Sequence, residues 1–256
     1  MSHVCKIPLR VYTPIGDGPF PVLLYFHGGG FVIADLDVYD SSPRALANAA
    51  NCIVVSSHYR QAPEDPYPAA HDDAVEAYRW VLENMEEIGG DGRVAIAGES
   101  AGGNLAAGVT IHARDEGMPL PVHQLLVYPI VDGDFTKPSF SEHANTKPLS
   151  KPMMDWFGKH YAPDQNDTHF AVSQADLTGL PPTTIVNAEV DPLRDDGKLF
   201  AEKLSAAGVD VEHKKFDGVT HEFFGMGAAV DTAKEAVELA ARRLVASFDR
   251  TTAQTR

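Results

Sequence analysis

The sequence has few cysteines and few basic residues, and each shortage excludes a class of protein. Cys5 and Cys52 are the only cysteines, too few for a disulfide framework or a cysteine-ligated zinc site. Cys52 is expected to be a buried strand residue. Lysine and arginine number 21 against 36 aspartates and glutamates, a formal net charge of −15. Because nucleic-acid binding needs a basic face, we predict no nucleic-acid partner and a solvated acidic surface.

Long apolar runs and metal-binding motifs are also missing. No apolar run approaches the roughly 20 residues that a membrane-spanning helix needs, and the N-terminal sequence MSHVCKIPLR has no apolar signal core. None of the 11 histidines stands in HExxH or HxH spacing, so we predict no metal site. We expect a cytoplasmic protein that does not insert into membranes.

Short apolar runs alternate with amphipathic helical patterns along most of the chain, as in the βαβ units of a parallel sheet. Helices are expected at 68–88, 194–207 and 229–248, and another after Ser100. With 44% hydrophobic residues and no linker, residues 1–256 are expected to form one α/β domain. Its mostly parallel, twisted sheet has about seven strands, with helices on both faces. The expected strands are 6–12, 21–26, 52–59, 94–98, 123–128, 184–190 and 211–216.

The alternation breaks between residues 131 and 180, where one short helix is expected at Met153–Tyr161. An ordered insertion of this length is usually functional, so we interpret it as a partial cap or a pocket wall. Met154 and Phe157 are candidate substrate contacts. Alternatively, the apolar side chains of this helix only pack it onto the body of the protein.

The stretch Gly98-Glu99-Ser100-Ala101-Gly102 fits the GxSxG pattern of a nucleophile elbow. An apolar strand precedes Ser100 and an alanine-rich helix follows it, a context that chance matches usually lack. Small residues at Gly98 and Gly102 allow the strand and the helix to approach closely. We therefore predict that Ser100 is a nucleophile.

A serine nucleophile needs a base, and the base needs an acid that orients it. Asp191 follows the strand 184–190, and His221 lies on a loop between the strand 211–216 and the last helix. The order Ser, Asp, His is the one found in α/β-hydrolases, so we predict the triad Ser100, Asp191 and His221. Asp191 before Pro192 could instead be a helix cap. The rival acids and bases are Asp195 and Asp196, inside the next helix, His213, inside a strand, and His58.

The run His27-Gly28-Gly29-Gly30 follows the strand 21–26 and leaves backbone N–H groups uncovered. A tetrahedral intermediate needs such donors at about 2.7–3.1 Å from its oxyanion. We predict an oxyanion hole made by Gly28, Gly29 and Ala101, with His27 as a structural residue of the loop. Phe31, directly after the glycines, is a third candidate substrate contact.

Together these motifs resemble the hormone-sensitive-lipase-like carboxylesterases, a family of α/β-hydrolases. The matching segments are HGGGF (27–31), YRQAPE (59–64), GESAGGN (98–104), DPLRDDG (191–197) and HEF (221–223). The resemblance implies an α/β-hydrolase fold and hydrolysis of short-chain carboxylic esters through an acyl-enzyme, without a cofactor.

The chain departs from this family at three places. Glu99 replaces the aspartate or threonine of GDSAGG or GTSAGG, and Gln61 replaces the leucine of YRLAPE. Fewer residues precede HGGG than in the family, which implies a reduced N-terminal cap and a more open site. Chain-length discrimination should then be weak or depend on residues 153–161. A partner subunit could cover the exposed apolar surface, which predicts a homodimer.

Two alternatives remain open. The same triad could serve an amidase, a formamidase or another acyl hydrolase, because pocket shape decides the substrate. A non-catalytic ligand-binding protein could also use this fold. Such members of the family typically lose the histidine, and His221 is present.

Overall fold

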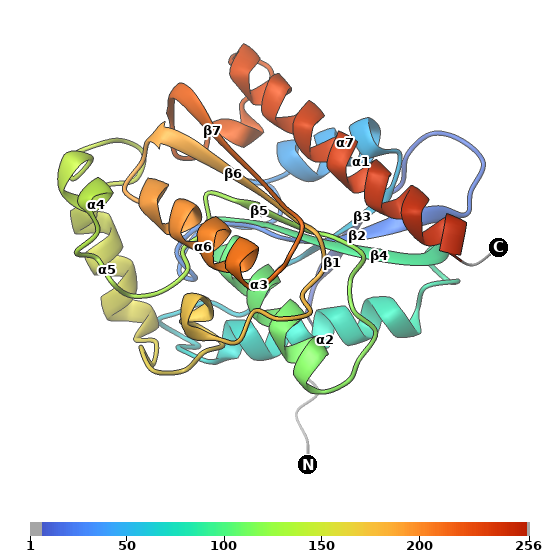
Figure 1. The fold of residues 1–256 in the computed structure, drawn as a ribbon, viewed down its shortest axis with the longest axis horizontal. Coiled ribbons are helices and arrows are strands. Elements are labelled where there is room, and N and C mark those ends of the chain that lie inside the picture. The colour runs from blue at the N-terminus through green and yellow to red at the C-terminus, as the bar shows by residue number, and fades with distance from the viewer. Residues whose placement is uncertain (1–6, 255–256) are drawn as a thin grey trace.

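The computed structural model describes residues 7–254, which contain a seven-stranded, mostly parallel sheet (Figure 1). The strand order is β1-β3-β2-β4-β5-β6-β7, and only β1 runs antiparallel to its neighbour. This confirms the predicted α/β class and the number of strands. The strands are β1 Leu9–Tyr12, β2 Phe20–Phe26, β3 Ile53–Ser57, β4 Gly90–Glu99, β5 Gln124–Val127, β6 Thr183–Val190 and β7 Val211–Thr220.

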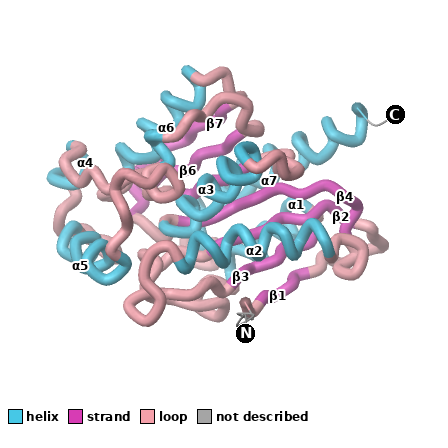
Figure 2. Tube along the Cα trace, turned by 90° about the horizontal axis from the view of Figure 1, so that it is seen from below, coloured by secondary structure: helices cyan, strands magenta, loops and turns pink. Residues whose placement is uncertain are grey.

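Helices cover both faces of the sheet, as predicted. α1 (Ser41–Ala50) and α7 (Asp231–Gln254) lie on one face, and α2 (Ala69–Glu83), α3 (Ala101–Asp115) and α6 (Arg194–Ala206) lie on the other (Figures 1 and 2). The short α4 (Pro138–Glu142) and α5 (Lys151–Tyr161) sit together at the end of the sheet toward which β6 points (Figure 1). The 131–180 insertion therefore covers the carboxyl ends of the strands.

The central strand β2 shows how the sheet forms two cores. Val22, Leu24 and Phe26 pack with the side chains under α2 and α3, whereas Leu23 and Tyr25 pack with those under α1 and α7. Successive side chains of a strand point to opposite faces, and all five are almost fully buried. A strand covered on both faces reads as a continuous apolar run, FPVLLYF, without alternation.

The junction between β4 and α3 depends on two glycines. A Cβ atom at Gly98 would lie 2.0 Å from the carbonyl oxygen of Gly102, and one at Gly102 would lie 2.1 Å from the carbonyl oxygen of Phe26. Backbone therefore packs directly on backbone at this corner. The predicted need for small residues at both positions is confirmed.

Several predicted boundaries are wrong. β4 begins at Gly90 instead of 94, β3 ends at Ser57 instead of 59, and α7 ends at Gln254 instead of 248. The helix expected at 68–88 ends at Glu83, and the backbone N–H and the side-chain amide of the following Asn84 both donate to the carbonyl of Trp80. The last strand extends to Thr220 instead of 216, pairing with β6 across a register shift. The first strand begins at Leu9, and Cys5 lies outside the described residues. Cys52 is buried directly before β3.

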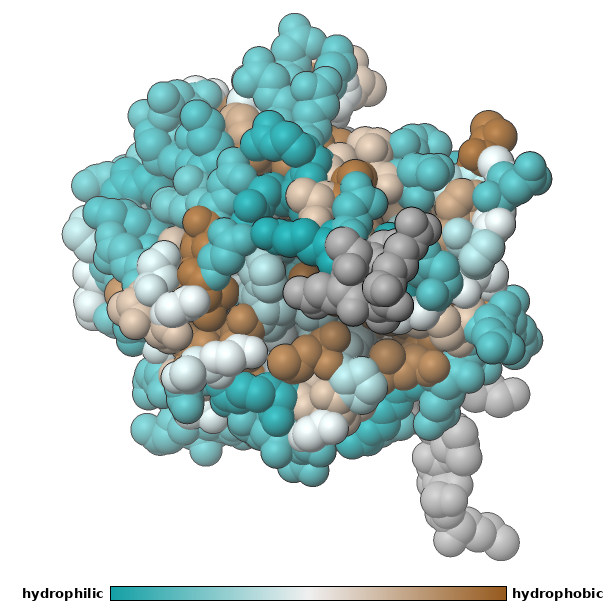
Figure 3. All heavy atoms as spheres, turned by 45° about the vertical axis from the view of Figure 1, so that its right-hand side comes forward, coloured by the Kyte–Doolittle hydropathy of each residue, from teal (hydrophilic) through white to brown (hydrophobic). Residues whose placement is uncertain are grey.

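Hydrophilic residues dominate the face shown in Figure 3, and apolar residues occur there in small groups. Within residues 7–254, every helix is too short or too polar to cross a membrane.

The glycine contacts predict the effect of adding one methyl group. Gly102→Ala would force the Cβ atom against the Phe26 carbonyl, and we expect a loss of about 3 kcal/mol in the free energy of unfolding. Gly158→Ala, inside α5, meets its nearest atom at 3.9 Å and should instead gain about 1 kcal/mol from helix propensity. Urea denaturation of both variants measures the difference; equal midpoints would contradict the packing described.

Candidate active site

Ser100 occupies a strained backbone conformation at the end of β4. Its φ of 55° and ψ of −117° lie in a region that residues with a side chain rarely adopt, and such strain clusters at functional sites. The Ser100 N–H donates to the carbonyl of Val127, and its carbonyl accepts from the N–H of Asn104. The turn thus joins β5 to the first turn of α3 and places the serine at the carboxyl edge of the sheet.

Asp191 and His221 form a buried pair at the same edge. Asp191 follows β6 and is fully buried, and its Oδ2 lies 2.7 Å from Nδ1 of His221, which follows β7. The other carboxylate oxygen accepts the N–H of Leu193 at 2.9 Å. Asp191 therefore fixes the turn before α6, whose N-cap is Leu193, and also contacts the histidine.

Carboxylates control the protonation of His221. Burial disfavours its charged form, but the carboxylates of Asp191, Glu222 and Glu99 outweigh burial and raise the pKa of His221 above its ordinary value. The ring also packs against Tyr128, with 4.3 Å between ring centroids. An imidazolium at this position is thus stabilised by the surrounding charges.

The glycine run after β2 forms a tight loop beside Ser100. Gly29 and Gly30 have φ values of 105° and 61°, which favour glycine. The carbonyl of Gly29 accepts the N–H groups of Val32 and Ile33, each at 3.0 Å. This closes the loop on itself. Ala101 is the first residue of α3, so its N–H belongs to the positive end of the helix dipole.

His27 has the contacts of a structural residue. It is fully buried, stacks on the Tyr59 ring at 4.5 Å and places Nδ1 2.7 Å from the Gly28 carbonyl. Burial lowers the pKa of His27 to about 4, so the ring is neutral near pH 7. The Tyr59 hydroxyl donates to the His27 carbonyl at 2.8 Å and fixes the start of the loop.

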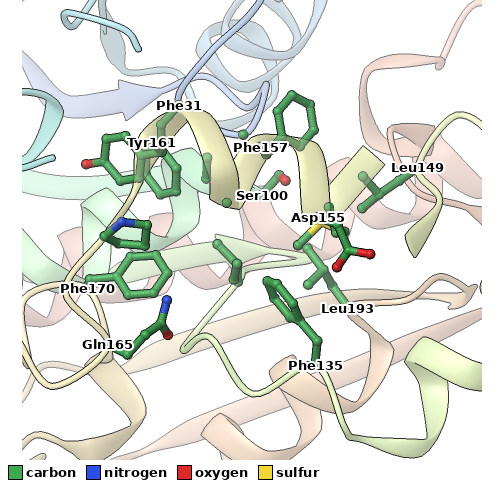
Figure 4. Close-up of a pocket in the computed structure, with 16 residues that line it drawn as sticks. Phe31, Ser100, Phe135, Leu149, Asp155, Phe157, Tyr161, Gln165, Phe170 and Leu193 are labelled. Atoms are coloured by element: carbon green, nitrogen blue, oxygen red, sulfur yellow. The ribbon is translucent and has the colours of Figure 1, made fainter. Parts of the chain in front are cut away.

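An apolar pocket of about 250 Å³ opens beside Ser100 (Figure 4). The three predicted contact residues Phe31, Met154 and Phe157 all line it. Most of the remaining wall comes from the 131–180 insertion, and apolar side chains of its irregular parts show no period that would single them out in the sequence. Phe135, Leu149, Tyr161 and Phe170 belong to the insertion, whereas Ile130 precedes it and Leu193 follows β6.

The helix around residues 153–161 packs onto the body of the protein and also lines the pocket, so packing is not its only role. Met154, Phe157 and Tyr161 of α5 are buried and also line the pocket. Phe31 stacks on Tyr161 with 4.1 Å between centroids. Trp156 points the other way and is 44% exposed. One face of α5 is therefore a pocket wall that packs on the loop after β2.

A buried polar chain connects α5 to α3. The Tyr161 hydroxyl lies 2.7 Å from Nδ1 of His71, and Nε2 of His71 lies 2.9 Å from the Asn104 side-chain oxygen. The Asn104 amide donates to the carbonyls of Ile130 and Phe170. Burial lowers the pKa of His71 to about 4. A neutral ring has one donor and one acceptor, so Nε2 donates to Asn104 and Nδ1 accepts from Tyr161.

The rival acids and bases have other partners. Asp196, inside α6 as predicted, is fully buried and lies 3.4 Å from the Lys137 ammonium, which also pairs with Asp132. Asp195 accepts the Ser139 N–H at 2.9 Å. These contacts fasten the start of the insertion to α6. His213 lies in β7 and contacts Asn187, and His58 follows β3.

Comparison with known proteins identifies the family of the chain. Residues 23–225 match the family model described as the alpha/beta hydrolase fold. Carboxylesterase NlhH of Mycobacterium tuberculosis is 47% identical over 239 residues, which cover 90% of this chain and 75% of the relative. Ethyl acetate hydrolase of Pseudomonas putida is 34% identical over 93% of this chain and 78% of its own length.

Solved esterase structures also superpose closely. The thermostable carboxylesterase EstE1, cloned from a metagenomic library, is 40% identical with a TM-score of 0.90 and covers 94% of this chain and 84% of its own. The esterase of Pyrobaculum calidifontis is 38% identical with a TM-score of 0.89. The match covers 94% of this chain and 81% of the esterase. The chain therefore belongs to the α/β-hydrolases and, within them, to the hormone-sensitive-lipase-like carboxylesterases.

Proposed function

We propose that this carboxylic ester hydrolase acts on short-chain esters with Ser100 as nucleophile, His221 as general base and Asp191 as the acid that orients the base. The observation that carries the proposal is the buried 2.7 Å contact between Asp191 and His221. It lies at the same sheet edge as the strained Ser100 turn. The Ser, Asp, His order of the family matches these positions.

The reaction proceeds by acyl transfer in two halves. His221 takes the Ser100 proton as Oγ attacks the ester carbonyl, and the resulting imidazolium protonates the leaving alcohol. The acyl group stays on Ser100. His221 then removes a proton from water, which attacks the acyl-enzyme, and the acid leaves as Ser100 regains its proton. Asp191 keeps Nδ1 protonated and stabilises the imidazolium in both halves.

The proposed oxyanion hole consists of the N–H groups of Gly28, Gly29 and Ala101. Two of these donors belong to a loop that left-handed glycines and the buried His27 hold in place. The third lies at the positive end of α3. Fixed donors stabilise the tetrahedral intermediate without reorganising during the reaction.

The pocket supports a small acyl group. Its volume of about 250 Å³ is below the roughly 300–1,000 Å³ of pockets that hold drug-sized ligands. Most of the wall is aromatic or aliphatic, and Asp155 and Gln165 add polar side chains, so the pocket favours an uncharged acyl chain. The 34% identical relative named ethyl acetate hydrolase fits the same substrate class. The cytoplasmic location and the homodimer stay predictions, which cell fractionation and light scattering at micromolar concentration would check.

Ser100→Ala tests the nucleophile. With p-nitrophenyl acetate, butyrate and octanoate, we expect the wild type to turn over the short esters and Ser100→Ala to lose about 10⁴-fold or more in kcat. Ser205→Ala, on the exposed side of α6, is the matched control and should keep wild-type kinetics. A fluorophosphonate should add its mass to the Ser100 peptide alone.

Label on another residue, or an active Ser100→Ala variant, would overturn the proposal. A wild type that is inert on the esters but cleaves p-nitroacetanilide would favour the amidase alternative.

Phe157→Ala tests the acyl pocket. Removing this ring from the wall should let longer chains bury two or three more methylenes, each worth about 0.8 kcal/mol. We expect the octanoate-to-butyrate ratio of kcat/KM to rise about 15- to 60-fold. Trp156→Ala, on the outward face of the same helix, should leave the ratio unchanged. If the two variants give the same ratio, α5 does not limit chain length.

A further inference from the structure

The residues next to the proposed base and the proposed nucleophile in the sequence are both glutamates. Glu222 follows His221, and Glu99 precedes Ser100 at the position where the family usually has aspartate or threonine. The reaction described above uses neither carboxylate. Both nevertheless lie close to His221, from two different elements.

Glu222 turns its side chain back toward the base. Its backbone is left-handed, with φ of 70°, and its Oε1 lies 3.7 Å from Nε2 of His221. Nε2 is the nitrogen that exchanges the proton in the proposed reaction. Asp191 contacts the opposite nitrogen, so the imidazole ring has a carboxylate on each side.

Tyr39 holds Glu222 in this orientation. The buried Tyr39 hydroxyl lies 2.7 Å from both carboxylate oxygens and donates its proton to them. The same hydroxyl packs against Gly28, where an added Cβ atom would lie 2.2 Å from it. One tyrosine therefore links Glu222 to the loop that supplies the proposed oxyanion donors.

Glu99 contributes less charge than Glu222. It is buried and accepts hydrogen bonds from Tyr25, at 2.7 Å, and from Tyr128. Burial, and then the charge of Glu222, raise the pKa of Glu99 to about 7, so it is partly protonated near neutral pH. The Tyr128 ring separates it from the His221 ring. Glu222 is thus the second carboxylate that faces the base directly.

We propose that Glu222, fixed by Tyr39, is a positioning residue that stabilises the imidazolium of His221 and sets its ring relative to the oxyanion loop. The inference rests on the proposed function, because it assigns His221 the role of base. Asp191 contacts Nδ1 of His221, and Glu222 would add a second carboxylate on the Nε2 side of the same ring.

The charged and titratable groups around His221 decide whether its pKa rises or falls when Glu222 is replaced. They are Asp191 after β6, Glu222 in its own turn, and Glu99 at the end of β4. Tyr128 packs on the ring, and Tyr39 and Tyr59 face Glu222. Carboxylates near a histidine raise its pKa. Removing the charge of Glu222 while keeping its shape should therefore lower the pKa of His221.

The test is the pH profile of kcat/KM for p-nitrophenyl butyrate with Glu222→Gln, Tyr39→Phe and the wild type. For Glu222→Gln we expect the acidic limb to move down by about one pH unit. At pH 7.5 we expect kcat to fall about tenfold, with KM within about twofold. Tyr39→Phe keeps the Glu222 carboxylate but removes the hydroxyl that holds it. The acidic limb should therefore move down by less than in Glu222→Gln. Glu202→Gln, on the exposed side of α6, should leave the profile unchanged.

An unmoved acidic limb in Glu222→Gln, whether kcat falls or not, would overturn the inference and leave Glu222 as a loop residue. If Glu222→Gln does not fold by circular dichroism, the limb of Tyr39→Phe decides in the same way. The proposed function fails separately, when the wild type is inert or Ser100→Ala stays active.

Discussion

The backbone of α3 lies closer to β2 and β4 than any side chain would allow, and the site depends on this approach. Gly98 and Gly102 have no Cβ atoms to separate the two strands from the helix. Ser100, between them, has a positive φ of 55°, and the residue lies at the carboxyl edge of the sheet. Because β2 takes part in the same contact through the carbonyl of Phe26, the loop after β2 is placed beside the serine. One steric constraint thus positions two parts of the proposed machinery.

The sequence predicted those features whose place in the fold follows from their place at the end of a strand. The GxSxG turn, the HGGG loop and the acidic and histidine residues after β6 and β7 lie at strand ends, and parallel strands end at one edge. Their shared edge follows from the parallel direction of β2, β4, β6 and β7. Local pattern also predicted that Asp195 and Asp196 lie within a helix and that His213 lies within a strand.

The features that escaped prediction depend on contacts between distant segments. Tyr39 and Glu222 are 183 residues apart, and nothing in either neighbourhood indicates that they meet. Residues 84–88 keep a helical spacing of apolar side chains but form turns after α2 ends at Glu83. The pocket wall outside α5 is similar: its residues follow no period, and tertiary packing selects which of them face Ser100.

The chain of hydrogen bonds from Tyr161 through His71 to Asn104 makes the insertion part of the cooperative unit of the fold. A neutral His71 allows only one direction for these bonds, and Asn104 of α3 carries the same chain on to the backbone on either side of the pocket. A segment tied in this way opens only when the core beneath it opens. The wall of the pocket is therefore not a hinged flap, and the size of the pocket is set by its side chains.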